Sequence, residues 1–199
     1  LGVDRKAAEH VNVDGAREAL EVAALCTRLQ MMVFHSTARV AGNRTGIVRE
    51  EDLDRGQSFS NVIEETRARA EKLMRGAMGR MPICVMRPSM VVGDSASGEV
   101  DRFDGPYLLI LLLLTSLPEL ALPLPGRGDL PLHLVPVDYV VRAAHALGRD
   151  PRAAGRTFHL VDPAPLTARR VFELVAQAGG RRTPRGSIPA RSVMAPRPS

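Results

Sequence analysis

The sequence predicts an α/β fold built around a parallel sheet. Short apolar runs of strand length alternate along the chain with longer segments whose apolar residues recur at helical spacing, the alternation that βαβ units produce. The apolar runs are continuous, as expected of parallel strands that helices cover on both faces. With 199 residues, 45% of them hydrophobic, the chain can build one core but not two full domains.

The first half of the chain contains two helices and an intervening strand. One helix is predicted over residues 14–29, where Asn12 or Asp14 can cap the N-terminus. Its apolar residues at helical spacing are Ala16, Ala19, Leu20, Ala23, Ala24 and Cys26. A short apolar run over 31–35 is the first strand, and a longer helix is predicted over 58–78.

The second half continues the alternation. Strands are predicted over 82–86 and 157–161, and helices over 137–147 and 167–178, the last of which ends at Gly179-Gly180. In the helix over 137–147 the residues expected to face the core are Val140, Val141, Ala144 and Leu147. Residues 93–131 are rich in Pro, Gly and Leu and are predicted to be irregular. Strands separated by helices favour right-handed crossovers in one parallel sheet.

The domain boundary follows composition. Residues 1–180 form the predicted domain, and residues 181–199 form a tail of Pro, Arg and Ser that is expected to be disordered. The net charge of +5 comes from this tail, which has no acidic residue and contains Arg181, Arg182, Arg185, Arg191 and Arg197. Without them the chain has 22 basic and 22 acidic residues, so nucleic-acid binding is not expected.

Cysteine and histidine usage excludes several classes. Cys26 and Cys84 both lie in apolar runs, which predicts buried free thiols and a cytoplasmic protein rather than a disulfide scaffold. The apolar run Tyr107 to Leu114 is too short to cross a membrane and is predicted to be a buried helix or a wall of the substrate pocket. No signal peptide opens the chain. The five histidines show no ligand spacing with cysteines or carboxylates, so no metal site is expected.

One predicted helix carries a family pattern. It reads Ser58-Phe59-Ser60-Asn61-Val62-Ile63-Glu64-Glu65-Thr66-Arg67 and is followed by Ala70-Glu71-Lys72-Leu73. This segment resembles the catalytic helix N-x-Y-E-x-T-K, with A-E after it, of the extended short-chain dehydrogenases/reductases. Ile63 stands at the tyrosine position and Arg67 at the lysine position. In that family the tyrosine passes a proton, and the lysine one turn later lowers its pKa and holds the nicotinamide ribose.

Other segments resemble the same family in the same order. They are Asn12-Val13-Asp14-Gly15-Ala16, the strand and loop from Val33 to Gly42, the segment from Met86 to Ser95, the segment from His133 to Val140, and the segment from Phe158 to Pro163. The closest branch is the male-sterility and thioester-reductase-like one. The resemblance implies that Thr37 supplies the catalytic hydroxyl and that Arg39 replaces a tyrosine. It also implies cofactor contacts at Ser36, Arg67, Pro88 and Ser89.

Several of these residues also suit structural roles. Thr37 can cap the local backbone, and Asn12 can cap a helix rather than hold water near the site. Arg67 can be a solvated residue on a basic helix face beside Arg69. In addition, Arg87 can be buried against a carboxylate, and Asp138 can cap its helix.

The family's cofactor fingerprint is absent from this sequence. No strand is followed by a glycine-rich turn and a helix, and the G-x-G formed by Gly126-Arg127-Gly128 follows a proline-rich stretch. The resemblance therefore implies an N-terminally truncated chain with the C-terminal half of a partial Rossmann-like, doubly wound parallel sheet and a small irregular substrate region around 93–131. NAD or NADP is the implied cofactor, bound weakly, and the partner is a small-molecule substrate. A homo-oligomer or a missing N-terminal half would complete the sheet.

The resemblance implies an NAD(P)-dependent oxidoreductase. Its reaction would be carbonyl or thioester reduction or epimerase/dehydratase-like chemistry, and this chain is expected to be inactive because Ile63 cannot carry a proton. A non-catalytic binding or interaction module and a decayed gene fragment are the alternatives.

Overall fold

The computed structural model describes residues 3–101, 106–117, 119 and 121–188. They divide into two compact units, one drawn from residues 1–96 and 135–161 and the other from 97–134 and 162–199. The first unit is the α/β body in which every predicted site residue lies, whereas the sequence predicted one domain through residue 180.

A three-stranded parallel sheet forms the centre of the first unit. Its order is β1 (Met32–His35), β2 (Ile83–Pro88) and β6 (Thr157–Leu160), with Phe34 opposite Val85 and Met86 opposite Phe158. All three strands were predicted, and β2 is buried along its whole length. A short pair of β3 (Met90–Val92) and β5 (Leu134–Pro136) follows the carboxyl end of β2.

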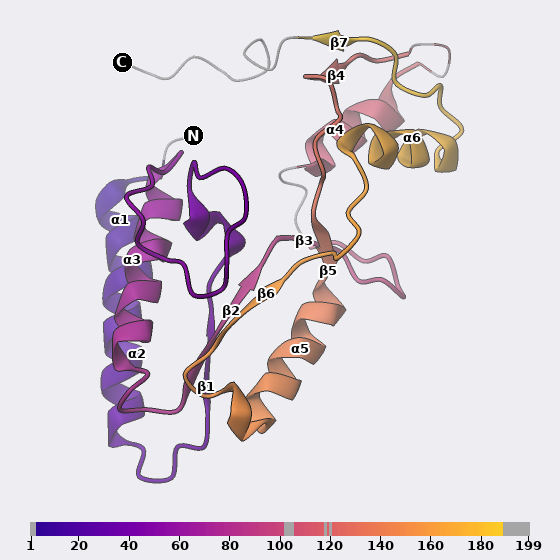
Figure 1. The fold of residues 1–199 in the computed structure, drawn as a ribbon. Helices are drawn as coiled ribbons and strands as arrows, with labels where there is room; N and C mark the ends of the chain where they lie inside the picture. Colours follow the sequence, from indigo (N-terminus) through magenta and orange to yellow (C-terminus); the bar gives the residue numbers. More distant parts are fainter. Residues whose placement is uncertain (1–2, 102–105, 118, 120, 189–199) are drawn as a thin grey trace. The chain divides into compact units, whose positions relative to one another are not determined.

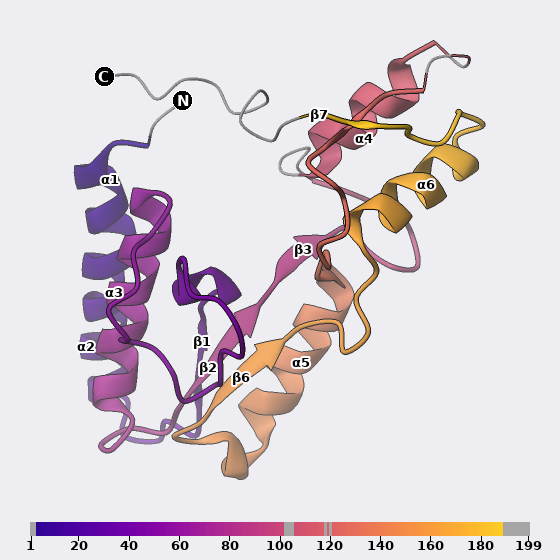
Figure 2. The same cartoon turned by 45° about the horizontal axis from the view of Figure 1, so that its top comes forward.

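Helices cover both faces of this sheet. Helices α2 (Gly15–Leu25) and α3 (Val62–Ala77) lie on one face, and α5 (Val137–Arg149) lies on the other (Figures 1 and 2). One core cluster lies between the first face of the sheet and helices α2 and α3. It contains Ala16, Ala70, Met74 and Val85, and Met32 and Phe34 pack against it. The other cluster contains Met86, Val135, Val140 and Leu160, with Val33 against it. Alternate residues of β1 and β2 therefore serve opposite cores, as in a doubly wound sheet.

The first helical segment begins much earlier than the sequence predicted. Helix α1 (Arg5–Glu9) is capped by Asp4, whose carboxylate accepts from the amide of Ala7 at 3.2 Å, and a π-helical turn η1 (His10–Asp14) leads directly into α2. Asn12 and Asp14 thus lie inside a continuous helix, and the prediction that one of them caps it is wrong. The π-helical turn interrupts the helical spacing of the apolar residues. The sequence therefore indicates a helix that begins only near Asp14, where an aspartate is a common cap.

Three smaller predictions, two about α5 and one about the end of α2, are wrong. Cys26 is exposed just after α2 ends, whereas Cys84 is buried in β2 and burial raises the pKa of its thiol. Val141 was expected to face the core, but it is 61% exposed. The carboxylate of Asp138 accepts from the amide and hydroxyl of Ser95 at 3.0 and 2.9 Å, so it ties a loop to α5 rather than capping the helix.

The second unit is built on two helices. Helix α4 (Pro106–Thr115) packs on α6 (Ala168–Ala178) through a cluster that contains Leu113, Leu124, Phe172 and Ala176. Strands β4 (Leu124–Pro125) and β7 (Ser187–Ile188) pair in parallel. The segment 93–131 was predicted to be irregular apart from a buried helix or pocket wall over 107–114, and it contains α4 and β4. Residues 189–199 of the predicted tail lie outside the described residues. None of the described helices is long and apolar enough to span a membrane.

Candidate functional site

The carboxyl end of β1 presents two adjacent hydroxyl groups in different environments. Ser36 is buried, and its Oγ donates to Glu71 Oε2 at 2.5 Å. Thr37 is half-buried and precedes the 3₁₀ turn η2 (Ala38–Ala41), where its Oγ1 accepts from the amide of Arg39 at 3.3 Å. Thr37 therefore caps the local backbone and leaves its hydroxyl hydrogen available. The Ser36 hydroxyl is directed to the core instead, so the cofactor contact inferred for it stays a prediction.

Helix α3 carries both of the substituted family positions. Asn61 caps this helix by accepting from the amide of Glu64 at 3.0 Å. Ile63 is 37% exposed, and Arg67 lies one turn later and is exposed, so both side chains occupy the same part of the helix surface. The side chain at position 63 can make apolar contacts but has no proton to give.

Arg39 replaces the tyrosine of the family loop and contacts the start of α3. Its Nη1 donates to Glu64 Oε1 at 3.0 Å, and Glu64 Oε2 accepts from the amide of Ser60 at 3.1 Å. Glu64 is buried although Arg39 is exposed. This ion pair fixes the turn that follows Thr37 to the N-terminus of the helix that carries Ile63.

A cavity of about 260 Å³ lies between the helices and β1. Its polar lining residues are Asn12, His35 and Arg67, and its apolar lining includes Phe34 and Met74. Loss of surrounding water lowers the pKa of His35 below its usual value of 6.5, and the nearby charge of Arg67 lowers it further. His35 is accordingly neutral at pH 7, and Arg67 provides the positive charge of the cavity.

Asn12 is held at this cavity by a bond between two helices. Its Nδ2 donates to Thr66 Oγ1 at 2.8 Å, and the Thr66 hydroxyl in turn donates to the carbonyl of Val62 at 2.8 Å. The hydroxyl hydrogen of Thr66 is donated to that carbonyl, so the hydroxyl oxygen must accept from Asn12. This fixes the orientation of the Asn12 side-chain amide. The π-helical turn η1 contains Asn12, so the bulge positions this side chain towards α3.

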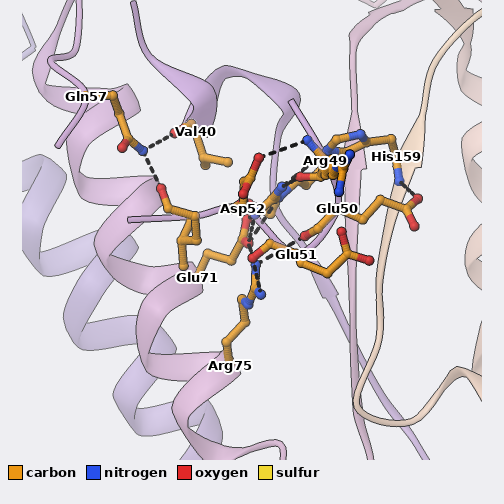
Figure 3. Close-up of polar contacts among 12 residues, drawn as sticks. Val40, Arg49, Glu50, Glu51, Asp52, Gln57, Glu71, Arg75 and His159 are labelled. Carbon is orange, nitrogen blue, oxygen red and sulfur yellow. Dashed lines mark hydrogen bonds and ion pairs between the residues drawn. The ribbon is translucent and has the colours of Figure 1, made fainter. Parts of the chain in front are cut away.

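A buried ionic cluster connects the strands to α3 and to the loop before it (Figure 3). Arg87 on β2 and Glu71 on α3 are 1% and 0% exposed, and the arginine donates from Nη2 to Glu71 Oε1 at 2.6 Å and from Nε to both carboxylate oxygens at 3.0 Å. Arg87 also donates to the carbonyl of Asp52 at 2.7 Å. The prediction that Arg87 is buried against a carboxylate is confirmed.

The loop over residues 49–52 is bound to this cluster from several sides. Arg75 of α3 donates to the carbonyls of Glu50 and Glu51 at 3.2 and 2.8 Å, and Glu50 accepts from the amide of His159 at 2.7 Å (Figure 3). The His159 ring lies 3.2 Å from Arg87 Nη1. Burial lowers the pKa of His159 below 6.5, and the charge of Arg87 lowers it further. A neutral ring next to Arg87 is therefore the stable form at pH 7.

The segment after β2 contains the other two predicted cofactor contacts. Pro88 is the buried last residue of β2, and the amide of Ser89 donates to the carbonyl of Leu160 at 3.0 Å. Ser89 Oγ is buried and accepts or donates no hydrogen bond among the described residues. Both contacts stay predictions.

The sequence reasoning missed the residues that organise the site. Glu71 was quoted only as part of a family pattern, and His35 was dismissed with the other histidines. A charged residue within an apolar helix face, four residues after Arg67, is the signal that could have identified Glu71 as buried. Among the described residues no three His, Cys, Asp or Glu side chains gather as a metal site would require.

The sequence of residues 3–144 matches the model of a protein family described as male sterility protein, an NAD-binding domain. The chain belongs to this family. The male sterility proteins fall within the extended short-chain dehydrogenases/reductases, so the inferred family and its doubly wound α/β fold are confirmed. NAD(P) is accordingly the cofactor of the family.

Two much longer fungal proteins are similar to most of this chain. It is 28% identical over 169 residues to a glycine betaine reductase of Emericella nidulans, and 27% identical over 168 residues to a nonribosomal peptide synthetase of Aspergillus flavus. These matches cover 81% and 78% of this chain but 13% and 16% of the relatives.

Solved structures show the same similarity. The terminal R domain from the myxalamid PKS-NRPS biosynthetic pathway is 30% identical, with a TM-score of 0.70 over 85% of this chain and 44% of that domain. An epimerase from Methanothermobacter thermautotrophicus, at 21% identity and a TM-score of 0.72, shares the fold over 92% of this chain and 54% of its own. The chain thus spans about half the length of these structures.

The residues of this male sterility family member fit one end of the cofactor. Thr37 and Arg67 supply a hydroxyl and a guanidinium that suit a carbonyl and a ribose, and the guanidinium of Arg67 has no ion pair within the described part of the chain. The 199 residues contain no glycine-rich turn for the pyrophosphate. Within these residues, the side chains that fit the cofactor are those at its nicotinamide end.

Proposed function

We propose that this chain is the catalytic-helix part of an NAD(P)-dependent oxidoreductase of carbonyl or thioester groups, and that it binds the nicotinamide end of the cofactor without reducing a substrate. The observation that carries the proposal is Ile63, an exposed hydrocarbon at the tyrosine position, one helical turn before a retained positive charge at Arg67. Reductase modules among the relatives support the carbonyl-level substrate class. Epimerase or dehydratase chemistry is the alternative within the same fold.

The roles of the residues follow from their chemistry. In the parent reaction of the family, a bound reduced nicotinamide would supply a hydride to the substrate carbon. Thr37 donates its hydroxyl hydrogen to the carbonyl oxygen, and Arg67 donates hydrogen bonds to the ribose hydroxyls. The negative charge that develops on the oxygen needs a proton, and neither the hydrocarbon of Ile63 nor a guanidinium such as that of Arg67 serves as a proton donor. Ligand binding is retained and turnover is not.

Binding is tested with two nucleotides of different length. Isothermal titration of the purified chain with NADH and with reduced nicotinamide mononucleotide should give weak affinities that agree within about threefold, because the chain carries no pyrophosphate site for the longer molecule to use. Arg67→Gln should weaken both, and Arg69→Gln should weaken neither. A micromolar affinity for NADH with none for the mononucleotide would contradict the proposal.

Turnover is tested by restoring the lost pair. Ile63→Tyr with Arg67→Lys should produce reduction of aldehydes, ketones or acyl thioesters by the reduced mononucleotide, measured as kcat/KM, where the unaltered chain gives none. Each change alone should do little, because the phenol and the ammonium act as one unit. The control is Ile63→Phe with Arg67→Lys, which has the ring without the hydroxyl. Equal rates for the tyrosine and phenylalanine variants would show that position 63 is not the missing acid.

A further inference from the structure

The segment of residues 43–58, here called the 43–58 loop, connects the turn after Thr37 to helix α3. Its two ends are joined, because the amide of Asn43 donates to the carbonyl of Ser58 at 3.0 Å and the amide of Ser58 donates to Asn43 Oδ1 at 2.9 Å. The 43–58 loop contains no helix or strand, and none of its residues is buried. A loop of this length with joined ends is an Ω-loop. Because it buries so little apolar surface, its attachment to the fold depends on polar contacts.

The polar contacts gather at the middle of the loop, residues 49–52 (Figure 3). All four backbone carbonyls of this stretch accept from arginines of the fold. Arg87 of β2 donates to two of them at 2.7 and 3.5 Å, and Arg75 of α3 donates to the other two at 2.8 and 3.2 Å. The carboxylate of Glu50 also accepts from the amide of His159 on β6 at 2.7 Å. A change at Arg87 or at β6 therefore acts directly on the loop.

The contact between Arg87 and His159 requires a neutral imidazole. Arg87 Nη1 lies 3.2 Å from His159 Nε2, and this Nη1 is also the atom that donates to the carbonyl of Arg49. A guanidinium has no acceptor and keeps its charge, so Nε2 must accept and the ring proton must be on Nδ1. Protonation of Nε2 would bring two donors of like charge together. The contact would then be repulsive.

The charged groups around His159 come from three elements. They are Arg87 of β2, Glu71 of α3, and Glu50 and Glu51 of the loop. Loss of surrounding water lowers the pKa of His159 below 6.5, and Arg87 lowers it further, whereas the three carboxylates oppose this shift without reversing it. The folded arrangement around the ring therefore favours the neutral form.

The ion pairs within the loop do not respond to the same change in pH. Hydrogen bonds from the amide of Arg49 and from the side chains of Arg44 and Arg55 hold the pKa of Asp52 well below its usual range. Lys72 likewise lowers the pKa of Asp54. These carboxylates stay charged in mildly acidic solution, so the loop keeps its internal pairs there.

We propose that His159 controls the attachment of the 43–58 loop: a neutral imidazole holds residues 49–52 on β2 and β6, and protonation of the imidazole releases them. Arg87 stays in place because Glu71 accepts from it on both carboxylate oxygens, so the exposed loop moves rather than the strand. The joined ends at Asn43 and Ser58 stay closed. The release requires no nucleotide and does not depend on the proposed function.

Amide hydrogen exchange followed by NMR measures the release. The reporter is the amide of His159, whose hydrogen bond to Glu50 exists only while the loop is attached. Its protection factor, in which the intrinsic effect of pH is removed, should fall about tenfold between about pH 7.5 and about pH 5.5, because the released ring binds a proton that the attached one excludes. The amide of Val85, which donates to Arg156 within the sheet, should keep its protection. Equal falls at both amides would show that the whole fold opens and would contradict a local release.

Variants at position 159 separate the imidazole from other titrating groups. His159→Gln provides an acceptor at every pH, so the protection of the amide at position 159 should no longer depend on pH. His159→Lys carries a charge at every pH and should lose this protection already at about pH 7.5, with Val85 again as the check on folding. His145→Gln, an exposed site on α5, should keep the full response. A tenfold fall that persists in His159→Gln would assign the effect to another group and overturn the proposal.

Discussion

At the residue scale, Glu71 is the side chain on which the site region depends most. Its carboxylate accepts from Ser36 on one oxygen and from Arg87 on both, and neither Glu71 nor Arg87 reaches solvent. Removal of one member of a buried pair leaves the other charge without compensation, which costs more than the intact pair contributes. Ser36 and Arg87 belong to family segments that were expected to contact the cofactor, and in the structure both side chains donate to Glu71.

The first residue-scale prediction concerns this pair. Glu71→Gln should lower the free energy of unfolding by about 3–5 kcal/mol, because Arg87 stays buried with its charge uncompensated. Urea denaturation measures the change. Glu71→Gln combined with Arg87→Met should be less destabilised than the single variant, and Glu65→Gln, which breaks the exposed pair with Arg5, should hardly move the midpoint. A double variant as unstable as the sum of the single ones would show that the two charges are not coupled.

A second residue-scale prediction concerns acid stability. The pKa of His159 is lowered in the folded state, so between that value and the unfolded value of 6.5 the unfolded chain binds more protons than the folded one. The stability of the fold should therefore decrease as pH falls below about 6.5. His159→Gln should reduce the loss measured by urea denaturation between about pH 7.5 and about pH 5.5. The exposed His145→Gln serves as the control and should preserve the full loss.

At the element scale, helix α3 positions Ile63 and Arg67 through its first turn. Asn61 caps the helix, and Glu64 binds both Arg39 and the amide of Ser60. The cap and the ion pair act on the same turn, so the residues at positions 63 and 67 keep their place relative to Thr37.

The cap can be tested by substitution. Asn61→Ala should destabilise the chain by about 1 kcal/mol, and Asn61→Asp should not, because an aspartate accepts the same hydrogen bond from Glu64. Urea denaturation measures the change in the free energy of unfolding of both variants. Loss of helical signal only in the alanine variant, seen by circular dichroism, would tie the cost to α3, and equal effects of both variants would contradict a capping role.

The sequence predicted the elements that rely on burial and missed those that rely on local geometry. The strands β1, β2 and β6 were predicted because helices cover both of their faces, and this requires continuous apolar runs. The start of α1 was missed because the π-helical turn shifts the phase of the apolar pattern at Asn12. For helix α4 the sequence left two interpretations, a buried helix or a pocket wall, since its residues are apolar on all sides and give no period.

The same limit applies to the candidate site. The family pattern located Thr37, Ile63 and Arg67 by number, whereas the cavity that joins Asn12 to Arg67 depends on the packing of η1 against α3. A contact between residues 54 positions apart has no signature in one sequence. The pairing of Ser36, Glu71 and Arg87 is of this kind as well.

At the scale of the whole molecule, β1 is an edge strand of the described sheet. It pairs with β2 on one side, and no described strand pairs with its other side. The amides of Met32 and Ser36 donate towards β2, so by alternation the amides of Val33 and His35 face the open edge. Unpaired edge groups of this kind readily accept another strand.

The open edge predicts self-association. Sedimentation velocity of the 199-residue chain should show species that grow with concentration, and Val33→Pro should reduce them, because proline removes an outward N–H while the amides that face β2 remain. Phe34→Pro would remove an inward N–H and should unfold the chain instead. A compact monomer at every concentration would show that the edge is covered in solution.

The buried bonds of Glu71 also make the anchoring of helix α3 independent of the side chains at positions 63 and 67. Glu71 fastens helix α3 to β1 and β2 one turn beyond Arg67, whereas the side chains of Ile63 and Arg67 are exposed and bind neither strand among the described residues. Substitutions at positions 63 and 67 leave the bonds of Glu71 to Ser36 and Arg87 in place. The side chains that determine reactivity on this helix can therefore change while the bonds that hold the helix to the sheet stay the same.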